Sequence, residues 1–133
     1  MTSGNVIGVG VDLCDVDRMR RVLARTPGFA ERVFTADEQS HCRARRDPAE
    51  RFAARFAAKE AVLKAMGVGL GACALRDIEV VRAESGQPSL ALHGAAADLA
   101  AARGITAWHV SLSHTSTVAE ALVVAVGRDT YPH

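Results

Sequence analysis

Apolar residues alternate with glycine or polar residues over residues 6–14, and this alternation constrains the fold more than any other feature. The apolar positions are Ile7, Val9, Val11 and Leu13, and the positions between them are Gly8, Gly10, Asp12 and Cys14. Successive side chains of a β-strand point to opposite faces of its sheet, so a period of two predicts a strand. We expect the apolar face to pack on the core. The glycines should clear the other face, so that Asp12 projects into open space.

Helix signals follow this strand through the first half of the chain. Asp15 is a capping residue, and Thr35 with Glu38 has the spacing of a capping box. The predicted helices run from these caps to about residues 25 and 46, and over residues 49–66 and 95–103.

The second half of the chain reads mostly as sheet. A hairpin is expected around Ser85-Gly86-Gln87-Pro88. The predicted strands are residues 77–82, 89–92, 107–113 and 118–126. The order of elements predicts an α+β fold in which helices pack on one face of a mainly antiparallel sheet.

Composition excludes several classes of protein. A length of 133 residues with 49% hydrophobic and 23% charged residues predicts a single globular domain over residues 1–133. The three cysteines lack a CxxC pair, which argues against a disulfide framework or a zinc site and for a reducing compartment. No signal peptide or membrane span is predicted, so a cytoplasmic location is expected. A net charge of +1 argues against a dedicated nucleic-acid binder.

Lysine occurs at only two positions, Lys59 and Lys64, among the 16 basic residues of the chain. Arginine is used everywhere else, so these two positions indicate a need for an ammonium group. An ammonium is a compact point charge, whereas a guanidinium is a planar fork. Because Glu60 lies between the two lysines, the segment suits phosphate binding combined with proton transfer.

Glu60 shares one face of the predicted helix with Phe56 and Lys64, because residues four apart are neighbours on a helix surface. One interpretation is a surface Glu–Lys pair that stabilises the helix by about 0.2–0.5 kcal/mol. The apolar surroundings favour a packed helix instead. A charged pair there costs desolvation, which favours a functional role.

Asp12 ends the apolar part of the predicted strand and can be read in two ways. It can be an ordinary turn acid, since Asp15 and Asp17 follow closely. It can also bind a hard cation, because Mg²⁺ typically takes one or two carboxylates plus water and substrate phosphates. Asp12 and Glu60 meet that minimum. The nearby basic side chains that can hold phosphate oxygens are Arg55, Lys59 and Lys64. This combination favours phosphate-transfer chemistry over proteolysis or glycoside cleavage.

The segment from His109 to His114 contains serine and histidine but no GxSxG elbow, so a serine hydrolase is not indicated. His114 is either a turn residue bonded to backbone or a donor to a ligand phosphate. The Gly8-x-Gly10 pair is not a dinucleotide fingerprint, because position 13 is leucine.

Arg18, Arg21 and Arg25 are spaced by three and four residues on the first predicted helix and form one basic ridge. The ridge is either a solvated helix face or a docking site for an acidic helical partner.

These segments together resemble the holo-[acyl-carrier-protein] synthases, the short class of 4′-phosphopantetheinyl transferases. The resemblance spans most of the chain, and its most specific marks are the leading aspartate and the (W/F)xxKExxxK segment. The matching segments are Gly10-Val-Asp12 with Asp15 and Arg18, Phe29-Ala-Glu-Arg32-Val-Phe-Thr35 through Glu38, Arg55-Phe-Ala-Ala-Lys59-Glu60-Ala, Lys64-Ala-Met-Gly67, Ser85-Gly86-Gln87-Pro88 and His109-Val-Ser-Leu-Ser-His114-Thr115.

The resemblance implies transfer of 4′-phosphopantetheine from coenzyme A to a serine of an apo acyl carrier protein, with Mg²⁺, releasing adenosine 3′,5′-bisphosphate. It implies that Asp12 and Glu60 hold the metal. Glu60, or a water ordered by the metal, would take the serine proton, and Lys64 would neutralise the bridging phosphate oxygen. The residues implied in cofactor binding are Arg55, Lys59, Lys64, Gly67, Gly86, Pro88, His114 and Thr115. The carrier's acidic helix would meet Arg18, Arg21 and Arg25.

The same resemblance implies half of a duplicated larger fold and a homotrimer with sites between subunits. Four positions depart from the family's usual residues: Cys14 replaces a third metal carboxylate of larger relatives, Phe56 a tryptophan, Gln87 a frequent lysine and Val118 a frequent tyrosine. A non-catalytic carrier-binding homologue and a Mg²⁺-dependent nucleotide pyrophosphate hydrolase remain alternatives. The sequence does not distinguish a fatty-acid from a polyketide carrier.

Overall fold

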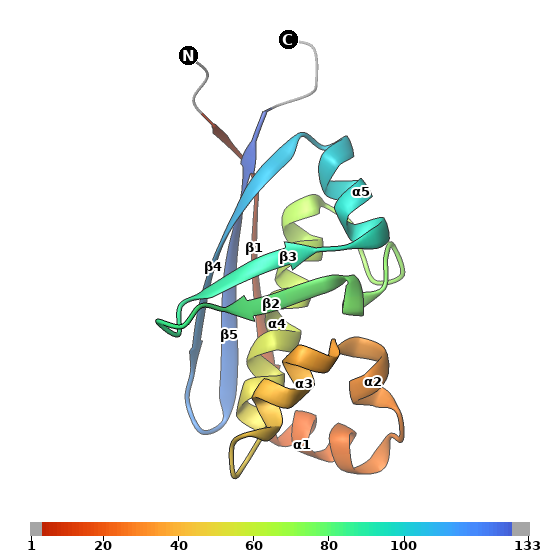
Figure 1. Cartoon of the computed structure of the whole chain (residues 1–133), viewed down its shortest axis with the longest axis vertical. Coiled ribbons are helices and arrows are strands. Elements are labelled where there is room, and N and C mark those ends of the chain that lie inside the picture. The colour runs from red at the N-terminus through yellow and green to blue at the C-terminus, as the bar shows by residue number, and fades with distance from the viewer. Residues whose placement is uncertain (1–3, 129–133) are drawn as a thin grey trace.

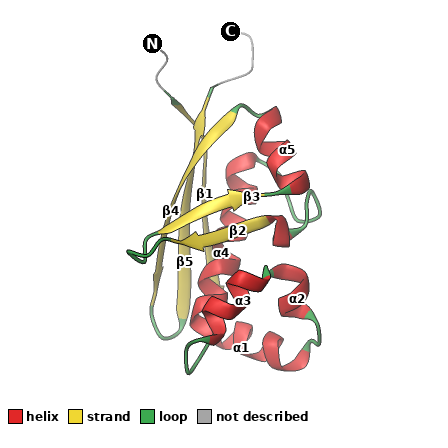
Figure 2. Ribbon diagram, viewed as in Figure 1, coloured by secondary structure: helices red, strands yellow, loops and turns green. Residues whose placement is uncertain are grey.

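A three-stranded antiparallel sheet lies against one side of a long central helix, and a two-stranded hairpin crosses beside it (Figures 1 and 2). The computed structural model describes residues 4–128. The larger sheet has the order β1-β5-β4, and the hairpin pairs β2 with β3. The strands are β1 (Asn5–Asp15), β2 (Ile78–Arg82), β3 (Pro88–Leu92), β4 (Ile105–His114) and β5 (Val118–Gly127). The predicted α+β class with antiparallel pairing is confirmed.

The helices all lie on one side of the larger sheet (Figures 1 and 2). They are α1 (Val16–Arg25), α2 (Phe29–Val33), α3 (Ala36–Arg43), α4 (Ala49–Met66), α5 (Gly94–Ala102) and the short 3₁₀ turn η1 (Leu75–Asp77). The predicted caps are confirmed, since Asp15 accepts from the Arg18 N–H and Thr35 forms the full capping box with Glu38. Helix α3 ends at Arg43, three residues earlier than predicted, and α2 was not predicted. Within residues 4–128, no helix is long and apolar enough to cross a membrane.

The two faces of β1 are the reverse of the prediction. A Cβ added to Gly8 or Gly10 would lie 1.9 Å from a backbone oxygen of α4, so the glycine face is the one that packs on the helix. The opposite face is open, with Val9 54% and Leu13 59% exposed. Alternation distinguishes two faces of a strand but does not say which one a helix covers. Contact between two backbones requires glycine.

Ile7 and Cys14 are the apolar residues of this strand that pack on the core, and a register irregularity lies between Val6 and Gly8. Asp12 follows the glycines on the helix-facing side, and its side chain is only 16% exposed. The prediction that Asp12 projects into open space is therefore wrong: its carboxylate lies 2.8 Å from the Lys64 ammonium of α4.

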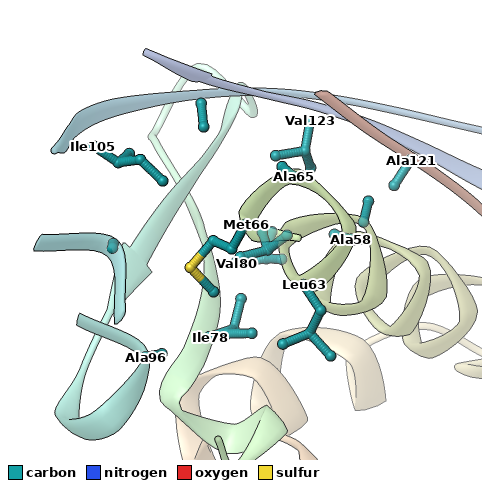
Figure 3. Close-up of a cluster of buried hydrophobic side chains, with 14 of the residues drawn as sticks. Ala58, Leu63, Ala65, Met66, Ile78, Val80, Ala96, Ile105, Ala121 and Val123 are labelled. Atoms are coloured by element: carbon teal, nitrogen blue, oxygen red, sulfur yellow. The ribbon is translucent and has the colours of Figure 1, made fainter. Parts of the chain in front are cut away.

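The main core lies between α4, the larger sheet and the hairpin (Figure 3). Met66 of α4 packs near Ile78 and Val80 of β2, while Val123 of β5 contributes from the sheet (Figure 3). Small side chains line the contact between α4 and β5, namely Ala57, Ala58, Ala61, Ala121 and Ala125, each 0% exposed. Alanine on both surfaces allows the helix to approach the sheet closely, which fixes α4 relative to β1.

A second cluster lies beneath α1, α2 and α3. The rings of Phe34 and Phe52 meet edge to face with centroids 4.8 Å apart, and Val16 and Met19 of α1 are buried beside them. This cluster holds α1 against the first half of α4, where the candidate site begins.

Candidate active site

Three of the predicted site residues, Asp12, Glu60 and Lys64, meet where β1 lies against α4, and we call this place the groove. The Lys64 ammonium donates to the Asp12 carboxylate at 2.8 Å and to the Val11 carbonyl at 3.1 Å. Glu60 lies one turn before Lys64 on the same face of α4, close enough to Asp12 for their charges to interact. The Lys64 side chain remains 57% exposed. Two partly buried carboxylates therefore lie beside one accessible cation.

Glu60 has a strongly perturbed acidity. Burial raises the pKa of Glu60 to about 7, and the negative charge of Asp12 adds to the effect, while Lys64 and Arg18 act in the opposite direction. Two carboxylates at one site resist being ionised together. A carboxyl group with a pKa near neutrality can accept or release a proton under physiological conditions.

Asp12 and Glu60 suit a hard divalent cation that takes most of its ligands from water and substrate phosphates. No group of three or more histidine, cysteine or acidic side chains in residues 4–128 is placed to hold a metal. Two carboxylates suit Mg²⁺, which commonly keeps several waters and binds substrate phosphates. Burial, followed by the charges of Glu60 and Asp12, raises the pKa of Cys14 to about 11, so its thiol stays protonated near neutral pH and is not an activated nucleophile.

Lys59 and Arg55 are enclosed in the protein, contrary to the prediction that they contact cofactor phosphates. Lys59 is 0% exposed and its ammonium donates to Glu38 and to the carbonyls of Leu75 and Ile78. Arg55 is 1% exposed. Successive helix residues differ by about 100° in direction, so the residue beside Glu60 points away from the groove. The predicted cofactor contacts of these two side chains conflict with their burial, and we do not retain them.

The remaining predicted cofactor residues lie in three other places. His114 ends β4 and Thr115 follows it, at the edge of the sheet opposite β1, where the His114 Nδ1 lies 3.4 Å from the Glu50 carboxylate. A cavity of about 310 Å³ there is lined by His114 with Arg45, Arg46, Asp47, Glu50 and Arg51. Gly86 lies in the β2–β3 turn with a φ of 88° and Pro88 begins β3; this turn projects past β4 (Figure 1). Gly67 caps α4 with a φ of 73°.

These positions separate into two groups within one chain. Cys14 of β1 and His114 of β4 both pair with Ala119 of β5, so β5 separates them. Two strand spacings amount to about 10 Å. The chain thus carries an acidic and lysine group at one sheet edge and a histidine and arginine group at the other.

The basic ridge of α1 borders the carboxylate groove. Arg18, Arg21 and Arg25 are exposed, and none of them forms a salt bridge within the described part of the chain, residues 4–128. Arg18 also lines a mostly apolar cavity of about 330 Å³ that reaches Glu60.

Sequence reasoning missed this cavity. Its apolar walls include Leu13, Met19, Val22, Phe29, Phe56 and Leu70. Phe29 and Leu70 come from irregular parts of the predicted chain, where no periodic pattern marks a surface. The apolar Met19 and Val22 beside the basic ridge are the sequence signal of an apolar surface there.

Comparisons with known proteins agree with this geometry. The family model of the 4′-phosphopantetheinyl transferase superfamily matches residues 8–125. The holo-[acyl-carrier-protein] synthase of Frankia casuarinae is 52% identical over 120 residues, which cover 90% of this chain and 97% of that protein.

Solved structures show the same architecture. An acyl carrier protein synthase of Plasmodium yoelii with ADP bound has a TM-score of 0.87 and 30% identity, covering 96% of this chain and all of that one. A Helicobacter pylori holo-[acyl-carrier-protein] synthase in complex with coenzyme A has a TM-score of 0.78 and 28% identity, covering 88% and 98% of the two chains. The chain therefore belongs to the 4′-phosphopantetheinyl transferase superfamily, in which it groups with the holo-[acyl-carrier-protein] synthases.

Proposed function

We propose that this protein transfers 4′-phosphopantetheine from coenzyme A to a serine hydroxyl of an apo acyl carrier protein and releases adenosine 3′,5′-bisphosphate. The observation that carries the proposal is the meeting of Asp12, Glu60 and Lys64 in one groove. The relative with bound coenzyme A supports the choice of donor, and the names of the relatives support the acceptor.

Asp12 and Glu60 are the residues that would hold Mg²⁺. When bound, this ion would neutralise charge on the pyrophosphate and polarise the phosphorus that reacts. Both carboxylates must be ionised to bind it, and the raised pKa of Glu60 is the reason that its affinity should increase with pH.

The chain's own residues supply the proton transfer and charge stabilisation. The serine oxygen forms a bond to the phosphorus that carries pantetheine, and the bond from that phosphorus to the bridging oxygen breaks with its electron pair on adenosine 3′,5′-bisphosphate. Glu60, which is ionised in this complex, accepts the serine proton. Lys64, which is exposed beside Asp12, stabilises the negative charge on the bridging oxygen.

Arg18, Arg21 and Arg25 form the proposed carrier-docking ridge. Their unpaired guanidinium groups can meet an acidic helix, and charge complementarity across such a surface gives specificity and fast association. The neighbouring apolar cavity offers contact area that a purely charged ridge lacks, and it leads from the ridge to Glu60.

We also propose that three copies assemble with sites between subunits. Paired residues of neighbouring strands share a sheet face, and Val11 pairs with Leu122 while Val9 pairs with Val124. Val9, Val11, Leu13 and Leu122 are each at least 40% exposed. A continuous apolar face of this kind usually marks an interface. Because β5 separates the His114 group from the carboxylates within one chain, a neighbouring copy is a reasonable source of the missing half of the site.

The test is incubation of an apo acyl carrier protein with this protein, coenzyme A and Mg²⁺, followed by intact-mass measurement. The expected result is a gain of one phosphopantetheine that requires both coenzyme A and Mg²⁺. Binding of the carrier without mass gain would indicate a non-catalytic homologue. Release of 4′-phosphopantetheine without a carrier would indicate a pyrophosphate hydrolase.

A further inference from the structure

We propose that Glu38 and Lys59 form a buried positioning pair that holds α4 in the rotation at which Glu60 faces Asp12. This inference rests on the proposed function, because positioning is defined relative to the transfer site. Glu38 and Lys59 do not touch the groove itself, since both side chains are 0% exposed.

All three N–H groups of the Lys59 ammonium have acceptors. One donates to Glu38 Oε1 at 2.8 Å and another to the Leu75 carbonyl at 3.1 Å, and the third goes to the Ile78 carbonyl. The ammonium also lies 5.3 Å from the centre of the Phe34 ring. A single tetrahedral donor can serve three divergent acceptors, whereas the planar guanidinium of arginine cannot. This geometry explains a lysine at position 59 in a chain that otherwise uses arginine.

Glu38 links the lysine to two further elements. Its Oε1 also accepts from the Thr35 N–H at 2.9 Å, which completes the capping box of α3. Its Oε2 accepts from the Val80 N–H of β2 at 2.9 Å. The pair therefore joins α4 to the start of α3, to η1 and to β2 through backbone groups, which are fixed points of the fold.

The direction of Glu60 follows from the direction of Lys59. Adjacent residues on a helix are turned by about 100°, so fixing Lys59 toward α3 and β2 directs Glu60 toward β1. On the β1 side, Gly10 meets the backbone of Ala61, which limits how far α4 can move toward the strand. The helix is thus located by backbone contact on one side and by an ion pair on the other.

Stability alone is a weak explanation for such a pair. Only three charged or polar side chains are buried in the described residues 4–128, and Glu38 and Lys59 are two of them. Replacing a buried ion pair with uncharged side chains often leaves the free energy of unfolding unchanged or increases it. A role in fixing one conformation is therefore the hypothesis to test for this pair.

The main test is the double variant Glu38→Gln with Lys59→Met, which removes both charges together and leaves neither one unpaired. Cooperative unfolding and the circular dichroism spectrum establish that it folds. Transfer is then measured well below its unfolding temperature. We expect kcat to fall about a hundred-fold, because small misplacements of a catalytic group have effects of this size. The KM values for coenzyme A and carrier should change by less than about three-fold, since neither binding surface is altered.

Glu38→Asp is a second variant in case the double variant does not fold. It keeps both charges but shortens the acid by one methylene, so it should also lower kcat with little change in KM. Ile105→Ala is the matched control, because Ile105 is buried at the far end of the core (Figure 3). It should lose stability and keep its kcat.

Several results would overturn the positioning role of Glu38 and Lys59. A folded variant with a kcat within about two-fold of wild type overturns the positioning role, as does an equal loss of kcat in Ile105→Ala. Failure of both variants to fold also overturns it, because the pair would then be required for the fold itself. Absence of transfer by the wild-type chain would overturn the proposed function, and this inference with it.

Discussion

The two lysines of α4 stand in opposite environments although they are only five positions apart. Lys59 is enclosed and all its hydrogen-bond donors are used by Glu38 and two carbonyls. Lys64 is 57% exposed and donates to Asp12 and to one carbonyl at the edge of a groove. The first lysine completes a structural network, whereas the second leaves its charge available to a ligand.

The same difference applies to their carboxylate partners. Glu38 accepts three hydrogen bonds in the interior, so its charge is compensated within the protein. Burial, and then the neighbouring Asp12 carboxylate, raise the pKa of Glu60 to about 7. Perturbed acidity of this kind is a feature of functional sites, where the missing compensation comes from a substrate or a metal.

Glu60→Gln, on the side of α4 that faces Asp12, should have the largest effect on the rate of transfer. The amide cannot accept the serine proton, so transfer to the carrier should fall by about a thousand-fold. Single-turnover kinetics with apo carrier would measure it. Asp98→Asn on α5 is the control, because it makes the same chemical change on an exposed helix away from the groove. A fully active Glu60→Gln would refute the assignment of the groove as the active site.

Gly10→Ala tests the contact that brings the strand to the helix. The new Cβ would meet the Ala61 carbonyl oxygen at 1.9 Å, so β1 and α4 must separate. We expect a loss of about 3 kcal/mol in the free energy of unfolding, the size of a severe overpacking substitution. Urea unfolding would measure it.

Gly69→Ala is the matched control for that substitution, since nothing lies within 4 Å of its added Cβ. Its unfolding free energy should stay within about 0.5 kcal/mol of wild type. Equal losses in the two variants would show that the glycine face of β1 does not depend on close approach to α4.

Charge reversal on the basic ridge of α1 should have a smaller effect, which concerns binding of the carrier. Reversing Arg18 and Arg25 to glutamate should raise the KM for the carrier about ten-fold or more and leave the KM for coenzyme A nearly unchanged. Steady-state kinetics with each substrate varied in turn would measure both. Arg128→Glu, which changes an exposed charge just after the end of β5, is the control. Equal changes in both KM values would show that the ridge is structural.

Local signals in the sequence predicted much of the fold and part of the site. Short-range chemistry determined the caps at Asp15 and Thr35, and these were predicted correctly. Helical spacing placed Glu60 and Lys64 on one face, and the structure brings them to Asp12.

Long-range packing could not be predicted in the same way. The identity of the covered face of β1 depends on where α4 lies, which no local period reports. The burial of Lys59 depends on a glutamate 21 residues earlier in the chain and on two carbonyls of a later turn. Both errors concern a choice between two faces of an element whose existence was predicted correctly.

The smallest predicted effect concerns pH, and it compares wild type with Glu60→Gln in the absence of metal. The pKa of Glu60 is raised in the folded protein to about 7, above its value of about 4.3 in an unfolded chain. The folded state therefore binds this proton more tightly, and the resulting stability is fully present below pH of about 4.3 and is lost as pH rises through about 7. Wild type should lose more stability than Glu60→Gln between about pH 5 and pH 8, because the amide does not titrate. Urea unfolding of both proteins at the two pH values in a chelator would measure the difference, and identical pH profiles would mean that the pKa of Glu60 is not raised in the folded protein.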